Sequence, residues 1–100
     1  MDIQTKLENG ELTVSPVGSL DSNTAGEMEA AVKALWEKEF TTLTLDMSGV
    51  DYISSKGVRI AVSLFKAMNA RDGKLRFTGL NTAVREVFHL SGLDTIFGLD

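Results

Sequence analysis

Apolar and polar residues follow recognisable periods along most of the chain. Residues 3–7 and 11–15 are two β-prone runs separated by Asn9 and Gly10. Asn-Gly is the strongest short signal for a hairpin, because both residues accept positive φ in a type I′ turn. We therefore expect two antiparallel strands at the start of the chain. Pro16 has no N–H for a ladder, so the end of the second strand should lie at a sheet edge or a bulge.

The next segments favour a helix and then a strand. Apolar residues recur at spacings of three and four; they are Ala25, Met28, Val32, Leu35 and Trp36. This spacing predicts an amphipathic helix that runs to about Lys38, with Asp21 or Ser22 as its N-cap. Residues 41–47 alternate strictly between apolar and polar, which predicts a strand with one buried and one polar face. Residues 48–53 are interpreted as a loop or short turn with apolar anchors.

A second helix is predicted to open at Ser54 and Ser55. Its apolar stripe consists of Val58, Ala61, Val62, Phe65 and Met68. The helix should end at Asp72 and Gly73, with the glycine in the left-handed C-terminal position. A strand over residues 74–78 follows.

The last quarter of the chain predicts one more helix. Asn81 is a good N-cap, and Gly92 marks the end of the helix, while residues 93–97 are expected to form a short strand or an extended tail. The order β-β-α-β-α-β-α-β predicts one α/β domain over residues 1–100, with a mixed sheet whose later strands are parallel. The one-sided pattern of residues 41–47 places the helices mainly on one sheet face, since a doubly wound sheet would need continuous apolar runs.

Composition removes several classes of function. The 100 residues carry 10 Lys and Arg against 14 Asp and Glu, a net charge of −4, so nucleic-acid binding is not expected. The absence of cysteine excludes disulfides, thiolate zinc sites and thiol nucleophiles. No apolar run has the length of a membrane span and no signal-peptide core is present, so we expect a cytoplasmic protein without membrane insertion.

Signals for catalysis are nearly absent, and we expect no enzyme, no cofactor and no metal. Neither glycine-rich phosphate motif occurs, and a single histidine, His89, excludes a multi-histidine metal site. His89 is interpreted as a helix-surface or half-buried residue, since no Gly-x-Ser-x-Gly elbow accompanies it. Trp36 and Phe40 favour core and helix-end packing over a binding platform. The candidate carboxylates, for which caps and turns are favoured over acid–base roles, are Asp21, Asp46 and Asp51.

The most informative segment is Ser54, Ser55, Lys56 and Gly57. Two hydroxyls stand where a helix should begin. One interpretation is a plain N-cap. The other is a phosphorylation site, because free N–H groups at a helix N-terminus stabilise a phosphoryl group while the added charge repels a docked partner.

At these residues the sequence resembles the STAS-domain anti-sigma-factor antagonists of bacteria. The resemblance spans nearly the whole chain, through residues 18–21 (GSLD), residues 43–57 (LTLDMSGVDYISSKG) and residues 81–93 (NTAVREVFHLSGL). It implies the STAS fold: an α/β domain with a mixed sheet, an N-terminal antiparallel hairpin and helices mainly on one face.

The resemblance also implies a partner-switching regulator. In the family, the unphosphorylated antagonist binds an anti-sigma factor that is also a serine kinase of the Bergerat type, which releases the sigma factor. Phosphorylation ends this binding, and a PP2C-type serine phosphatase restores it. The acceptor position falls on Ser55, with Ser54 as second choice, and Gly57 matches the motif glycine. The residues expected to bind the partner are Asp21, Ser22, Ser54, Ser55, Lys56 and Gly57.

This chain departs from the family pattern at two positions. Ser54 replaces the motif aspartate, and Lys56 stands between the acceptor and the glycine, where a cation would partly neutralise a phosphate. Two alternatives therefore stay open. One is a STAS interaction subunit of a transporter or signalling complex that is never phosphorylated. The other is a small-ligand or nucleotide-binding module, which retention on a nucleotide resin would favour.

Overall fold

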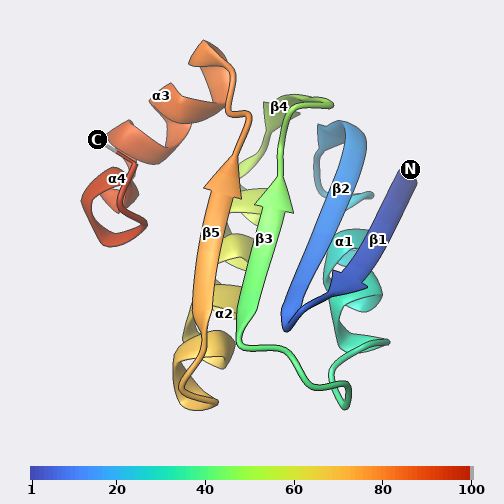
Figure 1. The fold of residues 1–100 in the computed structure, drawn as a ribbon. Coiled ribbons are helices and arrows are strands. Elements are labelled where there is room, and N and C mark those ends of the chain that lie inside the picture. Colours follow the sequence, from blue (N-terminus) through green and yellow to red (C-terminus); the bar gives the residue numbers. More distant parts are fainter. Residues whose placement is uncertain (100) are drawn as a thin grey trace.

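A computed structural model describes residues 1–99. Strands and helices alternate after an opening hairpin, and the strands form one mixed sheet (Figure 1). The strands are β1 (Asp2–Glu8), β2 (Glu11–Leu20), β3 (Thr42–Asp46), β4 (Val50–Ile53) and β5 (Lys74–Thr78). The helices are α1 (Ala25–Lys33), α2 (Ser55–Ala70), α3 (Thr82–Leu90) and α4 (Leu93–Ile96).

The N-terminal hairpin has the predicted turn. Asn9 has a φ of 53° and Gly10 a φ of 78°, as a type I′ turn requires. Glu8 and Glu11 face each other directly beside the turn, and β1 pairs antiparallel with β2 over its whole length. The prediction of an opening antiparallel hairpin is therefore confirmed.

Strand β2 organises the rest of the sheet. Its first half pairs parallel with β3 up to Val14, and its last residues pair parallel with β4 from Gly18 onward. Pro16 lies between these two pairings, just before the register irregularity at Gly18 and Ser19. Its missing N–H therefore falls where β2 changes partner, which is the kind of position that the sequence predicted.

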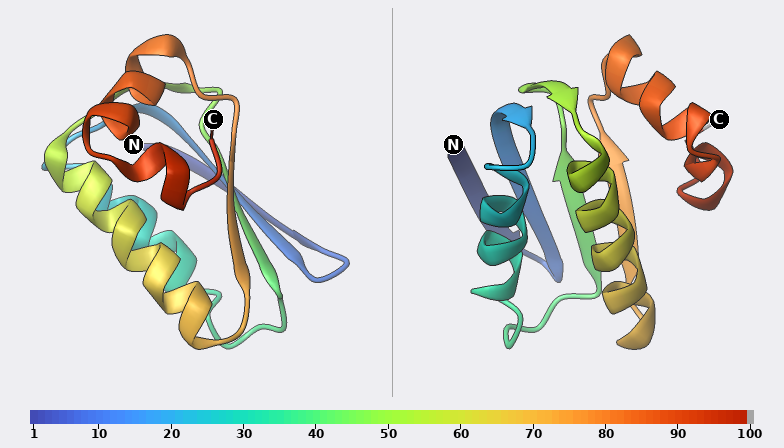
Figure 2. Two further views of the ribbon diagram at one scale, coloured as in Figure 1. Left: turned by 90° about the vertical axis from the view of Figure 1, so that its left-hand side faces the viewer. Right: turned by 180° about the vertical axis from the view of Figure 1, so that it is seen from behind.

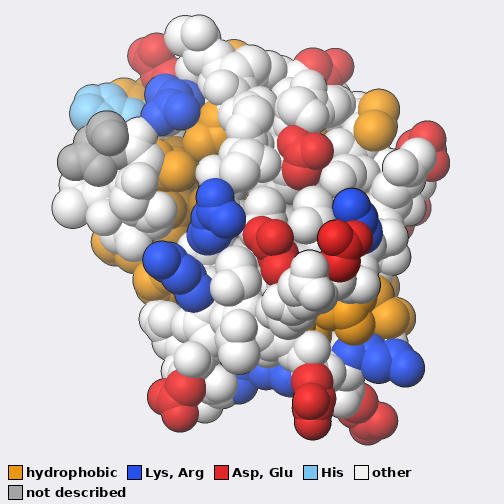
Figure 3. Space-filling model, in the orientation of Figure 1, with side chains coloured by type: hydrophobic (Ala, Val, Ile, Leu, Met, Phe, Trp, Pro, Cys, Tyr) orange, Lys and Arg blue, Asp and Glu red, His pale blue; other side chains and the backbone are white. Residues whose placement is uncertain are grey.

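Helices α1 and α2 cover one face of the sheet (Figure 2). The strand order is β1-β2-β3-β5, with β4 beside β2. Inward residues of the strands and helices form a single core that contains Leu12, Val14, Leu43, Leu45, Met28, Val32, Leu64 and Met68. Acidic and basic side chains are mixed on the opposite face (Figure 3). The mixed sheet with helices mainly on one face is thus confirmed.

Two segments form other elements than the sequence predicted. The segment predicted as a loop before Ser54 contains β4, where Val50 and Ile53 are buried but the two residues between them are exposed. Four residues with this pattern give no period-2 signal. Residues 93–97, expected as a strand or tail, form α4 instead. Phe97 at the end of α4 packs its ring 4.7 Å from that of Phe77 and 5.5 Å from that of Phe88, and this cluster fixes the helical turn.

The first helix is shorter than predicted. α1 ends at Lys33, and the following residues form tight turns in which Trp36 N donates to Lys33 O at 3.1 Å. The guanidinium of Arg71 donates hydrogen bonds to the carbonyl oxygens of Trp36 (3.0 Å) and Lys38 (3.2 Å), so these carbonyls accept from a side chain and not from a helical backbone. It also stacks over the rings of Trp36 and Phe40, so these aromatic residues pack structurally, as the sequence favoured.

At the end of α2, Asp72 and not Gly73 adopts the left-handed conformation, with a φ of 59°. Gly73 is needed for a different reason. A Cβ there would lie 2.6 Å from Met68 Cε and 2.9 Å from Thr41 O. The glycine therefore permits a close approach of the α2–β5 turn to the start of β3.

Candidate functional site

The N-terminus of α2 begins with a side-chain cap. Ser54 has an extended backbone, and its Oγ accepts a hydrogen bond from Gly57 N at 3.3 Å. Ser54 N in turn donates to Leu20 O at 2.8 Å, which ties the cap to the end of β2. Ser54 is therefore the N-cap that the sequence predicted, and its hydroxyl oxygen accepts a hydrogen bond from the first turn of the helix.

Ser55 is the first residue of α2 and its side chain is exposed. The first intrahelical bond runs from Val58 N to Ser54 O at 2.9 Å. The N–H groups of Ser55 and Lys56 precede it and point out of the helix end, where the helix dipole is positive. Ser55 thus carries an accessible hydroxyl in an environment that favours an anion.

Gly57 lets α2 approach β2 closely. A Cβ at this position would lie 2.6 Å from Ile53 Cγ1 and 2.8 Å from Leu20 O. Any side chain would therefore push the helix start away from the sheet. The glycine fixes the position of Ser54 and Ser55 relative to the end of β2.

Asp21 organises the loop between β2 and α1. Its Oδ1 accepts hydrogen bonds from Asn23 N (2.9 Å), Thr24 N (3.1 Å) and Thr24 Oγ1 (3.1 Å). The backbone bonds from Asn23 and Thr24 lower the pKa of the Asp21 carboxyl, which therefore stays ionised at neutral pH. The structure places the N-cap of α1 at Thr24, so the sequence expectation of Asp21 or Ser22 as the cap is wrong by two or three residues. The side chain of Asp21 satisfies the N–H groups before the helix instead.

The β2–α1 loop and the start of α2 lie side by side. Lys56 Nζ donates to Ser22 O at 3.3 Å, across a sequence separation of 34 residues. Together with the bond from Ser54 N to Leu20 O, this contact brings the loop at Asp21 and Ser22 next to the start of α2, where Gly57 is buried. The loop between β2 and α1 therefore lies beside the start of α2.

Tyr52 belongs to the same neighbourhood and was not singled out from the sequence. It lies on β4 two residues before Ser54, and it is 52% exposed despite its apolar ring. Beside it, Asp51 Oδ1 accepts a hydrogen bond from Ser19 Oγ at 2.8 Å. The one sequence signal for Tyr52 is an aromatic residue beside Ile53, and a four-residue strand is too short for this pattern to show which residue is exposed.

The other candidate residues have structural roles. Asp46 accepts a hydrogen bond from Ser48 N at 3.1 Å, and the bonds from Ser48 lower the pKa of its carboxyl. His89 lies exposed on α3, with Nδ1 at 2.6 Å from Asp94 Oδ2, and that contact raises the pKa of His89. Among residues 1–99, no group of three or more acidic or histidine side chains is arranged to hold a metal ion. Within the same range, no helix has the length and apolar character that a membrane crossing requires.

Comparison with known proteins agrees with this architecture. The sequence model of the STAS domain matches residues 2–100. BtrV of Bordetella bronchiseptica, described as an anti-sigma factor antagonist, is 35% identical over 89 residues, which are 89% of this chain and 77% of the relative. The anti-sigma-B factor antagonist of Listeria monocytogenes is 27% identical over 89% of this chain and 78% of its own length.

The fold is also similar to solved structures. The anti-sigma factor antagonist SpoIIAA of Bacillus in its unphosphorylated form superposes with a TM-score of 0.82 at 21% identity, over 94% of this chain and 84% of that structure. The phosphorylated form of SpoIIAA gives a TM-score of 0.75 at 19% identity, over 94% and 86%. These likenesses concern the fold, while the sequence match over residues 2–100 concerns the family. The chain therefore belongs to the STAS domain family, among the anti-sigma factor antagonists.

Proposed function

We propose that this protein binds an anti-sigma factor in its unphosphorylated state and thereby releases a sigma factor. The partner is a serine kinase of the Bergerat type, which phosphorylates Ser55 and ends the complex. A PP2C-type serine phosphatase removes the phosphate again. Since sigma factors act on RNA polymerase, the protein works in the cytoplasm. Anti-sigma factor antagonists are non-enzymatic regulators, which agrees with a chain whose polar residues serve as caps and turns.

The observation that carries this proposal is that the two serines at the start of α2 have different structural roles. The Ser54 hydroxyl caps the helix through Gly57 N, whereas Ser55 is exposed and stands at the positive end of the helix. A kinase therefore reaches Ser55 without breaking a contact of the fold. Ser54 is the second choice for the acceptor, because its modification would disturb the cap.

The fold should tolerate a phosphate on Ser55. An exposed anion at a helix N-terminus gains about 0.3–1 kcal/mol from the dipole and the free N–H groups. In a complex that covers this helix end, the same charge of −1.5 to −2 would lose its water without gaining a partner. The charge therefore acts on binding and leaves folding nearly unchanged.

We propose a binding surface made of Asp21, Ser22, Ser54, Ser55 and Lys56, with the buried Gly57 keeping the start of α2 close to β2. The contact of Lys56 with Ser22 O holds its ammonium over the loop. Lys56 therefore supplies a positive charge between loop and helix, where it partly screens a phosphate on Ser55. We propose that this screening makes the switch of this protein weaker than one with a neutral residue at that position.

The proposal is tested by measuring partner binding and thermal stability together. Ser55→Asp should leave the melting temperature nearly unchanged and abolish binding to the anti-sigma factor, while Ser55→Ala should bind constitutively. Ser63→Asp is the matched control, because it adds the same charge at an exposed position further along α2 and should keep binding. Unchanged binding of Ser55→Asp would refute the switch.

Mass spectrometry after incubation with the kinase identifies the acceptor. Phosphate is expected on Ser55, and phosphate on Ser54 alone would move the acceptor by one residue. Lys56→Ser should deepen the loss of binding that phosphorylation causes, because it removes the screening cation. No phosphate on either serine would favour the STAS interaction module that never switches.

A further inference from the structure

The main sheet has two free edges, at β1 and at β5. Within residues 1–99, no strand pairs with the outer side of either. Strand β1 has seven residues and β5 has five. An unpaired edge of this length is a template for another strand, and natural proteins usually protect it with like charges or bulges. The two edges of this sheet differ in that respect.

The register of the hairpin shows which groups β1 offers. Glu8 and Glu11 flank a two-residue turn, so they exchange hydrogen bonds, and so do the alternate residues of β1 behind them. The N–H and C=O groups of Ile3, Thr5 and Leu7 consequently point away from β2 and toward solvent. They form an unused ladder along the whole edge.

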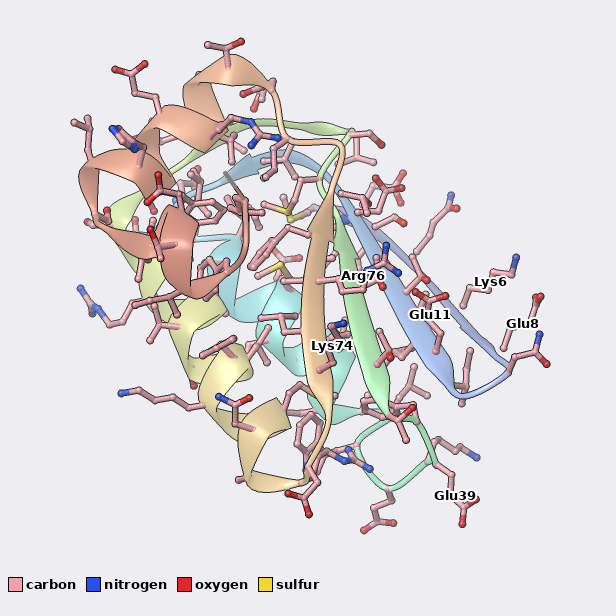
Figure 4. The ribbon with its side chains drawn as sticks, turned by 60° about the vertical axis from the view of Figure 1, so that its left-hand side comes forward. Lys6, Glu8, Glu11, Glu39, Lys74 and Arg76 are labelled. Carbon is pink, nitrogen blue, oxygen red and sulfur yellow. The ribbon has the colours of Figure 1, made fainter. Side chains whose placement is uncertain are left out.

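The charged side chains of β1 all lie on one face of the strand. Lys6 and Glu8 project from the face opposite the helices (Figure 4), and the alternation of a strand places Asp2 and Gln4 on that face too. Lys6 Nζ lies 3.3 Å from Glu8 Oε2, but both side chains are largely exposed, so this pair contributes little. On the other face, Leu7 is 40% exposed.

We propose that β1 pairs antiparallel with β1 of a second copy of this chain, with Gln4 of each copy at the two-fold axis. In this register, Asp2 lies opposite Lys6 of the other copy, and the symmetry makes this ion pair twice. These are positions without mutual backbone bonds, where side chains approach most closely. The backbone groups of Ile3 then pair with those of Thr5 of the second copy.

Charge selects this register over its neighbours. Shifting the pair by one step toward the turn places Asp2 opposite Glu8 of the other copy, and a further step places Lys6 opposite Lys6. Both arrangements set like charges against each other, which destabilises a cross-strand pair. A register centred on Leu7 also sets Lys6 opposite Glu8, but it pairs only the last three residues of β1. Among the registers that pair most of the strand, the one centred on Gln4 is the one that joins opposite charges without setting like charges against each other.

The opposite edge is protected against the same event. The exposed side chains of β5 on this face include Lys74 and Arg76, which Figure 4 shows on one strand. When two β5 strands pair antiparallel over their whole length, Arg76 lies opposite Arg76, and a shift of one step toward the start of the strand sets Lys74 opposite Arg76. The like charges therefore block β5, whereas the β1 edge is complementary to itself.

Helix α1 leaves room for such a pair. It packs over β1 and β2, and the N-terminal amine of Met1 lies 3.3 Å from Glu27 Oε1 on α1. With strands about 4.8 Å apart, two copies joined through β1 bring their α1 helices to about 10 Å, the usual spacing of packed helices. Ala30 on α1 and Ala34, its C-cap, are exposed and small enough for this approach.

The register is tested by single cysteines, since the chain has none of its own. Gln4→Cys should form a disulfide-linked dimer under mild oxidation, because the two Cα atoms at the axis are about 4.5 Å apart. Lys6→Cys, on the same strand and face, should stay monomeric on a denaturing gel. Cross-linking through Lys6→Cys but not Gln4→Cys would overturn the proposed register.

The association itself is tested by sedimentation of the unmodified chain over a range of concentrations. We expect a dimer that Lys6→Asp weakens on the order of tenfold, since both ion pairs become repulsive, and that Asp2→Lys/Lys6→Asp restores. Lys66→Asp on α2 is the control and should not weaken the dimer. The proposal would be overturned by a protein that stays monomeric up to about 1 mM, or by a dimer whose dissociation constant does not change in Lys6→Asp. The β1 variants lie away from α2, so their binding to an anti-sigma factor reports separately on the proposed function.

Discussion

Replacing Gly57 by alanine tests whether close packing at the start of α2 outweighs helix propensity. In an ordinary helix this change stabilises, because alanine loses less backbone entropy than glycine, by roughly 0.5–1 kcal/mol. Here the new methyl group would meet Ile53 Cγ1 at 2.6 Å and Leu20 O at 2.8 Å. The side chain of Ile53 is buried, and Leu20 O is held by the bond from Ser54 N, so neither atom moves freely.

The two effects can be compared. Overpacking in a close-packed region costs typically 1–3 kcal/mol, and it exceeds the propensity gain of up to about 1 kcal/mol. We expect Gly57→Ala to lower the free energy of unfolding by about 1 kcal/mol. For a domain of this size, that corresponds to a melting temperature lower by about 4–8 °C.

Gly26 provides a matched control on α1. It lies inside a helix, is exposed, and a Cβ there would meet no atom within 4 Å. Gly26→Ala should therefore raise the stability by up to about 1 kcal/mol, opposite in sign to Gly57→Ala. Urea unfolding followed by circular dichroism measures both values from the midpoint and slope. Equal or greater stability of Gly57→Ala would show that the helix start shifts at no cost, and the argument from close approach would be wrong.

Three further predictions concern the core, the loop and the α3–α4 corner. Leu45 is fully buried, so Leu45→Ala should cost about 2–5 kcal/mol in urea unfolding, and a change below about 0.5 kcal/mol would place this residue on the wrong face. Asp21→Ala should weaken anti-sigma factor binding by more than its effect on folding explains, as calorimetry of a folded variant would show; unchanged binding would leave Asp21 a purely structural residue. The raised pKa of His89 means that its pairing with Asp94 stabilises the fold fully below the ordinary value of 6.5, and that this contribution is lost as the pH rises through the raised pKa. The stability difference between the unmodified chain and His89→Gln should therefore vanish in alkaline solution, and a difference independent of pH would contradict the pairing.

Local chemistry made most of the fold predictable from the sequence. Asn9 and Gly10 determine the turn and hence the hairpin register, because few residues tolerate positive φ at both positions. The alternation in β3 and the cap at Ser54 are likewise signals carried by neighbouring residues. Each of these elements is defined within a window of a few positions, where sequence patterns are strongest.

The elements that the sequence missed depend on distant contacts. Strand β4 exists because the end of β2 shifts register at Gly18 and Ser19 and offers it a parallel partner more than thirty residues away. Helix α4 exists because Phe97 completes an aromatic cluster with rings from β5 and α3. No local period encodes either event.

The candidate site shows the same division. The positions of Ser54 and Ser55 follow from the start of a helix, which a sequence signals through its capping residues. The contact of Lys56 with Ser22 O and the exposure of Tyr52 follow from how β2, β4 and α2 meet. They could be found only once the parallel pairing of β2 with β4 was known.

The rigidity of this junction decides how a modification at Ser55 can act. Ser54 is bonded both to Gly57 N and to Leu20 O, and Gly57 leaves no space between helix and sheet. A charge added at the exposed hydroxyl of Ser55 breaks none of these contacts. It therefore gives the start of α2 no reason to change position. An effect on a partner must then arise from the charge itself, at the surface where the partner would sit. A switch built in this way would work by repulsion and desolvation in the complex, and the proposed phosphate would leave the structure of the unbound protein unchanged.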